Sequence, residues 1–259
     1  MTGLLRVVQR NLIVYRRVWR GSLFSSFLQP TMYLLAMGLG IGALVDRTAA
    51  ALPGDVAFLD FLAPGLLAAA CMQTATFESS WPVLGKIRWD RTYDAILATP
   101  LGVGDIVRGE LAWVALRLTT VAGAFTIVMA LFDVPRSWTT LLAIPAAVLT
   151  GVAFSAPVLA FAARRSVVSG SNSFNTMFRF VITPLFLFSG VFFPIERLPA
   201  LLQAAAWGTP LFHGVALVRG LVLGSFESWI WLVHLGYLLV MLAVGYVAAL
   251  WMFRRRLHA

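Results

Sequence analysis

Residues 229–253, WIWLVHLGYLLVMLAVGYVAALWMF, contain no charged side chain, and Arg254, Arg255 and Arg256 follow them directly. A helix that crosses a bilayer needs about 20 consecutive apolar residues, so this run is long enough to span a membrane. Basic residues gather on the cytoplasmic flank of such helices. The stretch therefore predicts a transmembrane helix whose carboxyl end lies in the cytoplasm.

The composition extends this interpretation to the whole chain. Of its 259 residues, 60% are hydrophobic and 12% are charged, and the mean hydropathy is +0.86. A soluble domain carries about 25% charged residues, so the composition excludes a water-soluble globule, and the apolar content excludes a disordered chain. At about 20 apolar residues per crossing, the length allows about six spans.

Six apolar segments divide the chain. We place them at 23–45, 57–81, 107–131, 138–163, 174–193 and 229–253. The region 194–228 is also apolar, but prolines and glycines interrupt it, among them Pro194, Pro199 and Pro210. Irregular backbone at membrane depth is tolerated only against protein or a wet cavity. This region, which includes His213, therefore predicts a re-entrant hairpin of two half-helices between the last two spans.

Residues 1–22 predict an amphipathic helix, because at about 100° per residue their apolar and basic side chains fall on opposite faces. The apolar face holds Leu5, Val8, Leu12, Tyr15 and Trp19. The basic face holds Arg6, Arg10, Arg17 and Arg20. We expect this helix to lie in the membrane interface with its arginines toward lipid phosphates. A plain basic tail that sets the topology is the alternative.

The distribution of basic residues predicts the orientation. With a cytoplasmic N-terminus, fifteen basic residues fall on the inner side: Arg6, Arg10, Arg16, Arg17, Arg20, Lys86, Arg88, Arg91, Arg108, Arg164, Arg165, Arg179, Arg254, Arg255 and Arg256. Four fall on the outer side: Arg47, Arg136, Arg197 and Arg219. Arg117 lies inside a predicted span and is left out of the count. Both termini are therefore expected in the cytoplasm, which requires an even number of crossings and supports six.

Other kinds of site find little support. The basic residues flank apolar runs and do not form a basic module, which argues against nucleic acid as a partner. The histidines are scattered, and no cluster has metal-ligand spacing. Residues 38–42, GLGIG, lie within a predicted span and lack the Lys-Ser/Thr of a phosphate loop. We therefore expect no catalytic, cofactor or metal site in this chain.

The longest predicted cytoplasmic loop, residues 82–106, contains a short helix. Apolar side chains recur along it at helical spacing, its other face is charged, and Thr99-Pro100 ends it. Such a helix suits docking to a soluble partner, because apolar residues fill a groove and charges fix the register. An amphipathic turn resting on lipid headgroups is an equal alternative from these residues alone.

Two motifs resemble those of ABC-2 type exporter permeases. The first is Arg91-Thr92-Tyr93-Asp94-Ala95-Ile96-Leu97-Ala98-Thr99-Pro100-Leu101 in this loop, followed by Gly102-Val103-Gly104-Asp105. The second is Phe188-Ser189-Gly190-Val191-Phe192-Phe193-Pro194, continuing to Pro199, Thr209-Pro210 and Arg219-Gly220. The sequence is most similar to the permeases of nodulation lipo-oligosaccharide exporters, with daunorubicin-resistance permeases as relatives. The resemblance covers nearly the whole chain.

The resemblance implies an all-α polytopic protein: an interfacial helix at 1–22 and a six-span domain at 23–259. It also implies a coupling helix between spans two and three that seats in a cytoplasmic ABC ATPase. The coupling residues would be Arg91, Tyr93, Asp94, Ile96, Leu97, Thr99, Pro100 and Leu101. Two permease subunits, expected as a homodimer, would pair with two ATPases that bind ATP and magnesium. The substrate would be an amphiphile: a glycolipid, a lipo-oligosaccharide or a hydrophobic drug.

Two further groups of residues are candidates for contact with the substrate. Glu78 and Arg117 lie within predicted antiparallel neighbouring spans, and ionisable groups at that depth are often functional. They can form a structural ion pair, or Arg117 can bind an anionic lipid or sugar headgroup. Span five carries a stripe of phenylalanines that, given the resemblance, could line a substrate cleft, although such stripes commonly face lipid. Its members are Phe174, Phe178, Phe188 and Phe192.

Two other functions compete with an ATP-driven exporter. An ion-coupled secondary carrier needs an acid near the membrane centre, and Glu78 lies near one end of its span. A membrane-embedded transferase needs a constellation of Asp, His and Ser at the interface, which the sequence does not offer.

Overall fold

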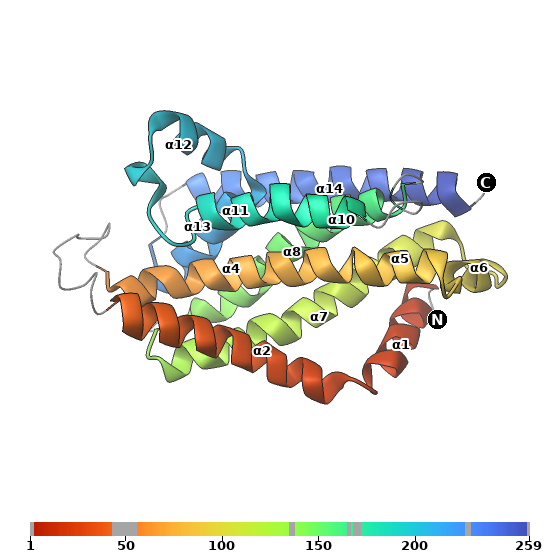
Figure 1. Cartoon of the computed structure of the whole chain (residues 1–259), viewed down its shortest axis with the longest axis horizontal. Helices are drawn as coiled ribbons and strands as arrows, with labels where there is room; N and C mark the ends of the chain where they lie inside the picture. Colours follow the sequence, from red (N-terminus) through yellow and green to blue (C-terminus); the bar gives the residue numbers. More distant parts are fainter. Residues whose placement is uncertain are drawn as a thin grey trace.

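The computed structural model describes residues 3–42, 56–134, 138–164, 167, 172–225 and 229–257, and within these ranges it contains helices and no strand. The helices form an elongated bundle along one axis (Figure 1). Four helical segments are long and apolar enough to cross a membrane: Phe58–Arg88, Val103–Leu131, Thr140–Ala162 and Ile230–Leu257. They correspond to predicted spans two, three, four and six, so the multi-span helical class is confirmed.

The first of these segments comprises α4 (Phe58–Glu78) and α5 (Trp81–Arg88), and the other three are α7, α8 and α14. A fifth candidate is a bent pair, α12 (Ala200–Trp207) and α13 (Pro210–Leu223), whose axes meet at 83°. Pro210 opens α13, and Thr209 caps it by accepting a hydrogen bond from the backbone N–H of Phe212. Over its described residues, 194–225, the region predicted as a hairpin is thus broken into short helices where its prolines stand.

The remaining two predicted spans are helical but irregular. Residues of the first form α2 (Trp19–Tyr33) and continue as a π-helix, η1 (Leu34–Gly42); the predicted end at residue 45 lies outside the described ranges. Residues of the fifth form α10 (Asn172–Met177), the π-helical η2 (Phe178–Ile182) and α11 (Thr183–Phe188). The helix therefore ends before the predicted residue 193, because Gly190 adopts a φ of +76° that turns the chain.

Helix α8 lies at the centre of the packing and contacts α4, α7, α13 and α14. Its Gly151 permits the approach to α4, since a Cβ there would lie 2.8 Å from the carbonyl oxygen of Cys71. Burial then differs strongly between helices: 72% of the apolar window of α4–α5 is buried but only 17% of that of α14. Helix α14 therefore leaves most of its apolar surface exposed on the outside of the bundle.

The N-terminal region departs from the predicted single amphipathic helix. Helix α1 (Gly3–Tyr15) ends in a turn at residues 16–18, and α2 begins a new direction (Figure 1). Val7 and Asn11 of α1 are buried against the bundle, whereas Leu5 stays exposed. Arg10 is half-buried, and its guanidinium donates hydrogen bonds to Asn11 and Thr92.

The two ends of the bundle carry different parts of the chain. Both chain termini lie at the end that carries α6 (Thr92–Leu97), and α12 lies at the opposite end (Figure 1).

Arg219 ties the bent pair to the rest of the bundle. Its guanidinium donates hydrogen bonds to the carbonyl oxygens of Phe61 on α4, at 3.1 Å, and of Gly190, at 2.9 Å. It also stacks on the Phe61 ring, with 3.7 Å between the guanidinium carbon and the ring centroid. The helix α13, the turn after α11 and the start of α4 are thus joined by one cation.

Replacing Arg219 with Leu is expected to destabilise the protein in mild detergent by about 1.5–3 kcal/mol, because hydrogen bonds from a charged donor are lost in a buried place. Thermal unfolding measures the change. The matched control is Arg179→Leu, which removes an exposed arginine that stacks on Phe180. Equal melting temperatures for the two variants would contradict the role given to Arg219.

Candidate functional site

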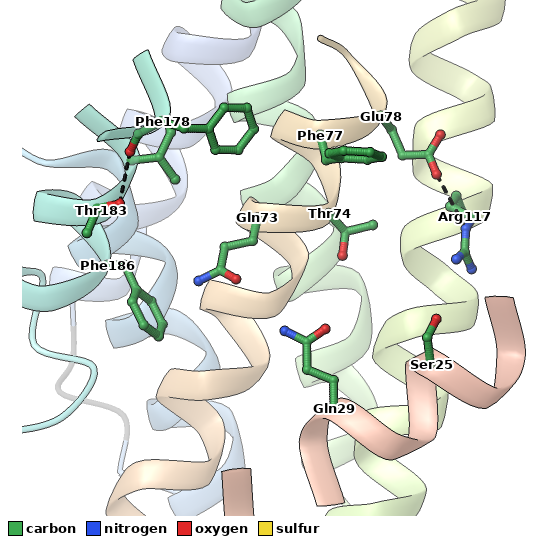
Figure 2. A pocket seen from close by; sticks show the side chains of 11 residues that line it. Ser25, Gln29, Gln73, Thr74, Phe77, Glu78, Arg117, Phe178, Thr183 and Phe186 are labelled. Carbon is green, nitrogen blue, oxygen red and sulfur yellow. Dashed lines mark hydrogen bonds and ion pairs between the residues drawn. The ribbon is translucent and has the colours of Figure 1, made fainter. Parts of the chain in front are cut away.

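A pocket of about 530 Å³ opens between α2, α4, α7 and the η2–α11 segment (Figure 2). Its lining residues are Ser25, Gln29, Gln73, Thr74, Phe77, Glu78, Arg117, Phe178, Ile182, Thr183 and Phe186. The volume falls within the range of about 300–1,000 Å³ that is usual for small-molecule sites. The pocket thus joins segments that the sequence places in spans one, two, three and five.

The lining combines neutral polar groups with aromatic rings. Figure 2 shows the amides of Gln29 and Gln73 directed toward the same space from two different helices, while Phe178 and Phe186 lie on the η2–α11 side. Amides and hydroxyls both donate and accept hydrogen bonds, and aromatic rings offer apolar faces. The pocket can therefore hold a ligand that is polar in one part and apolar in another.

Glu78 and Arg117, the two charged residues of the lining, lie together at one edge of the pocket. Nε of Arg117 is 3.6 Å from Oε1 of Glu78. Arg117 also donates hydrogen bonds to the hydroxyls of Tyr15, at 3.3 Å, Thr120, at 3.1 Å, and Ser22. Its guanidinium stacks on the Tyr15 ring at 5.2 Å.

These contacts bear on the two predicted roles of Arg117, a structural ion pair with Glu78 or a binding site for an anionic headgroup. The side chain of Arg117 is only 10% exposed, and protein groups occupy its donors. A buried charge is tolerated when it is paired and hydrogen-bonded, as here. The geometry therefore favours a structural pair that holds the α1–α2 turn against α4 and α7, and it leaves the pocket near electrical neutrality.

The four phenylalanines predicted to line a cleft do not share one surface. Phe178 lines the pocket. Phe174 is fully buried elsewhere, with its ring 5.2 Å from Trp81. Phe192 packs on Phe186 at 5.0 Å, and Phe188 is exposed. The stripe was drawn for a regular α-helix, and the π-helical turns of η2 and the bend after Phe188 change the directions of these side chains.

Two polar residues within the predicted spans indicated the pocket, but the prediction of substrate-contacting residues did not use them. Gln29 and Gln73 are uncharged amides inside predicted spans one and two, and polar residues at membrane depth commonly face the protein interior or a wet cavity. Phe77 and Phe186 complete the lining, and only the folded chain brings them to it.

The predicted coupling residues form a compact knob at the end of the bundle. Arg91, directly before α6, has a left-handed conformation with φ at 45°, and Asp94, Thr99 and Pro100 are exposed. Ile96, Leu97 and Leu101 are half-buried. Only the exposed part can contact another protein.

Tyr93 faces inward and differs from its neighbours on α6. It is 1% exposed and packs edge-on against Phe253 of α14, with 5.7 Å between the ring centroids. Burial raises the pKa of the Tyr93 phenol well above its usual value, and the nearby Glu110 carboxylate raises this pKa further. Tyr93 therefore anchors α6 and does not form part of its exposed face.

The predicted hairpin residues take different positions. His213 is buried, and its Nδ1 lies 2.7 Å from Nδ1 of His234 on α14. Its other ring nitrogen lies 2.9 Å from the carbonyl oxygen of Trp207, and Tyr237 stacks on its ring. His213 thus fastens the bent pair to α14. Pro194 is buried, whereas Pro199 is exposed at the start of α12.

Comparison with known proteins identifies the family of this chain. The ABC-2 type transporter family matches residues 2–223. The chain belongs to the ABC-2 type transporter family. It is similar to Nodulation protein J of Rhizobium leguminosarum bv. trifolii, with 32% identity over 97% of this chain and 92% of that protein. Nodulation protein J of Neorhizobium galegae is 33% identical over 99% and 95%. The inner membrane transport permease YadH of Escherichia coli is 24% identical over 79% and 77%.

Membership of the ABC-2 family has direct consequences. Its members are permease subunits of ABC transporters, so the chain is a multi-pass protein of the inner membrane, and an ABC ATPase subunit is implied as a partner. The pocket and the exposed face of α6 are then the two features of this permease that need a function. Among the described residues, no group of three or more His, Cys, Asp or Glu could hold a metal ion.

The pocket geometry predicts a pattern of thiol reactivity. In a Cys71→Ala background, Phe186→Cys is expected to react with a small water-soluble thiosulfonate at least about tenfold faster than Phe174→Cys, because only Phe186 lines the pocket. Mass spectrometry of the labelled permease measures both rates. Equal reactivity at the two positions would contradict the pocket.

Proposed function

We propose that the chain is the transmembrane permease subunit of an ATP-driven exporter that moves an amphiphile outward across the cytoplasmic membrane. The single observation that carries this proposal is the pocket that Gln29 and Gln73 line together with the rings of Phe178 and Phe186. The amides suit a polar headgroup and the rings suit an apolar chain. A glycolipid, a lipo-oligosaccharide and a hydrophobic drug all fit this description.

The near-neutral lining favours an uncharged polar headgroup within this class. Arg117 is engaged by Glu78 and three hydroxyls, so a headgroup that relied on the free cation would have to displace these partners. Hydrogen bonds from amides and hydroxyls are then the remaining means of recognition. The match to the ABC-2 type transporter family supports transport, and the name of the relative YadH states that it is a transport permease.

The proposed topology has six spans with both termini in the cytoplasm. Spans one and five are the segments Trp19–Gly42 and Asn172–Phe188, and the bent pair α12–α13 is a re-entrant hairpin at the outer side. Two observations support this topology: fifteen basic residues against four, and the position of both termini at the end that carries α6 (Figure 1).

The energy comes from two copies of a separate ATPase, which bind ATP and magnesium, and the permease works as a pair of identical subunits. Closure of the ATPases on ATP displaces α6. The exposed residues Asp94, on α6, and Thr99 and Pro100, directly after it, are positioned to contact them. The two permeases then rock, and the substrate leaves the pocket toward the outside.

Purification in mild detergent tests the function. An ATPase subunit is expected to co-purify, and an uncharged glycolipid is expected to stimulate ATP hydrolysis about twofold or more, because substrate binding favours the closing state. Gln73→Leu should remove most of the stimulation. The matched control is Gln9→Leu, since Gln9 is exposed on α1 away from the pocket lining. The proposal would be contradicted if no ATPase co-purified, or if the glycolipid stimulated ATP hydrolysis equally in the unaltered permease and in Gln73→Leu.

Asp94→Arg is expected to lower the ATPase activity of the assembled complex about tenfold, because reversing a charge at the centre of a small contact sets like charges against each other. The control is Glu196→Arg, the same change at an exposed position in the hairpin region. Tyr93→Ala should instead lower the melting temperature, since Tyr93 is buried within its own chain. Normal coupled activity with Asp94→Arg would remove α6 from the mechanism.

A further inference from the structure

A buried polar cluster joins α6 to three other helices, α1, α5 and α7. Nζ of Lys86 on α5 lies 2.7 Å from each carboxylate oxygen of Glu110 on α7. The side chains are 13% and 2% exposed, so water screens this ion pair poorly. Lys86 also donates a longer hydrogen bond of 3.4 Å to Oδ1 of Asn11 on α1.

The cluster continues to the first residue of α6. Arg10 donates from Nη1 to Oδ1 of Asn11 and from Nη2 to Oγ1 of Thr92, both at 3.1 Å. The charges of Glu110 and Arg10 act on the pKa of the Tyr93 phenol in opposite directions: Glu110 raises it and Arg10 lowers it. Helix α6 is six residues long and is too short to be stable alone, so the hydrogen bond from Arg10 of α1 and its packing against α5 and α7 hold it in place.

Two helical paths lead from this cluster to the pocket. On α7, Glu110 lies seven residues before Arg117, which is about two turns, so both side chains are on one face of the helix. On α1, Asn11 lies one turn before Tyr15, whose hydroxyl accepts a hydrogen bond from Arg117 at 3.3 Å. Arg117 in turn lines the pocket. The cluster and the pocket are therefore joined through two rigid elements.

Stability alone does not explain an ion pair in this place. A buried ion pair loses hydration that its attraction repays only with good geometry, and apolar residues of similar size often stabilise a protein equally well. A buried pair does fix the relative positions of the elements that carry it, because a shift of either element leaves a charge unpaired. Lys86 is also the single lysine among 20 basic residues, and its compact ammonium meets both oxygens of Glu110.

We propose that Lys86 and Glu110 are a positioning pair that makes α1, α5, α6 and the start of α7 move as one body, so that displacement of α6 reaches Arg117 and the pocket. The inference rests on the proposed function, because it requires an ATPase that displaces α6. It adds the residues through which the displacement travels inside the permease.

The test follows the pocket while the nucleotide state changes. Gln73→Cys in a Cys71→Ala background is reconstituted in liposomes with the ATPase partner, and a membrane-impermeant maleimide reports its reactivity with and without ATP plus vanadate. With the ion pair intact, we expect the two rates to differ about fivefold or more, a usual size for coupling between sites. With Lys86→Met or Glu110→Gln, ATPase binding and hydrolysis should persist while this nucleotide dependence disappears.

Two further variants separate positioning from folding. The exchange Lys86→Glu with Glu110→Lys restores opposite charges and should restore most of the nucleotide dependence, whereas a fold that needed the original side chains would not recover. Arg108→Gln removes the exposed pair that Arg108 forms with Asp105 on the same helix, at 3.0 Å, and should leave the dependence unchanged.

Each failure has a separate meaning. If Lys86→Met keeps the nucleotide dependence, or if it only releases the ATPase, the pair does not transmit the displacement and the inference is overturned. If the unaltered permease binds no ATPase, the proposed function fails instead, and co-purification detects that case independently of the pocket labelling.

Discussion

A charge or a free backbone group at membrane depth must find its partners inside the protein, because the hydrocarbon offers none. This constraint organises the structure. Arg117 is satisfied by Glu78 and by hydroxyls of the N-terminal region, and Arg219 is satisfied by carbonyl oxygens of α4 and of the turn after α11. Each cation joins segments that the apolar packing alone would leave free to slide.

The same interactions organise the proposed mechanism. Helix α7 carries Glu110 in the cluster next to α6 and Arg117 at the edge of the pocket. One helix therefore contributes to both the cluster beside α6 and the pocket. The central helix α8 packs against α4, α7, α13 and α14, whereas the π-helical η2 supplies Phe178 and Ile182 to the pocket lining. Regular helices suit transmission of a displacement, and irregular turns are frequent at functional sites.

Much of the fold could be predicted from apolar runs, because hydrophobic length reports membrane crossings directly. The site was less predictable. Antiparallel neighbouring spans suggested that Glu78 and Arg117 meet, and the structure brings them together. The periodicity of a regular helix placed Phe174 on one stripe with Phe188, but the π-helical η2 lies between these two residues, and Phe174 is buried in the core. Pairing of Lys86 with Glu110 depends on how two helices return past each other, and local sequence does not encode that register.

The most direct test of the account asks which end of the bundle contacts the ATPase. A photo-crosslinking amino acid is placed at Ala98, which is exposed directly after α6, or at Leu201, which is 82% exposed on α12. The account predicts a crosslink to the ATPase from position 98 and none from position 201. A crosslink from position 201, with none from position 98, would contradict it.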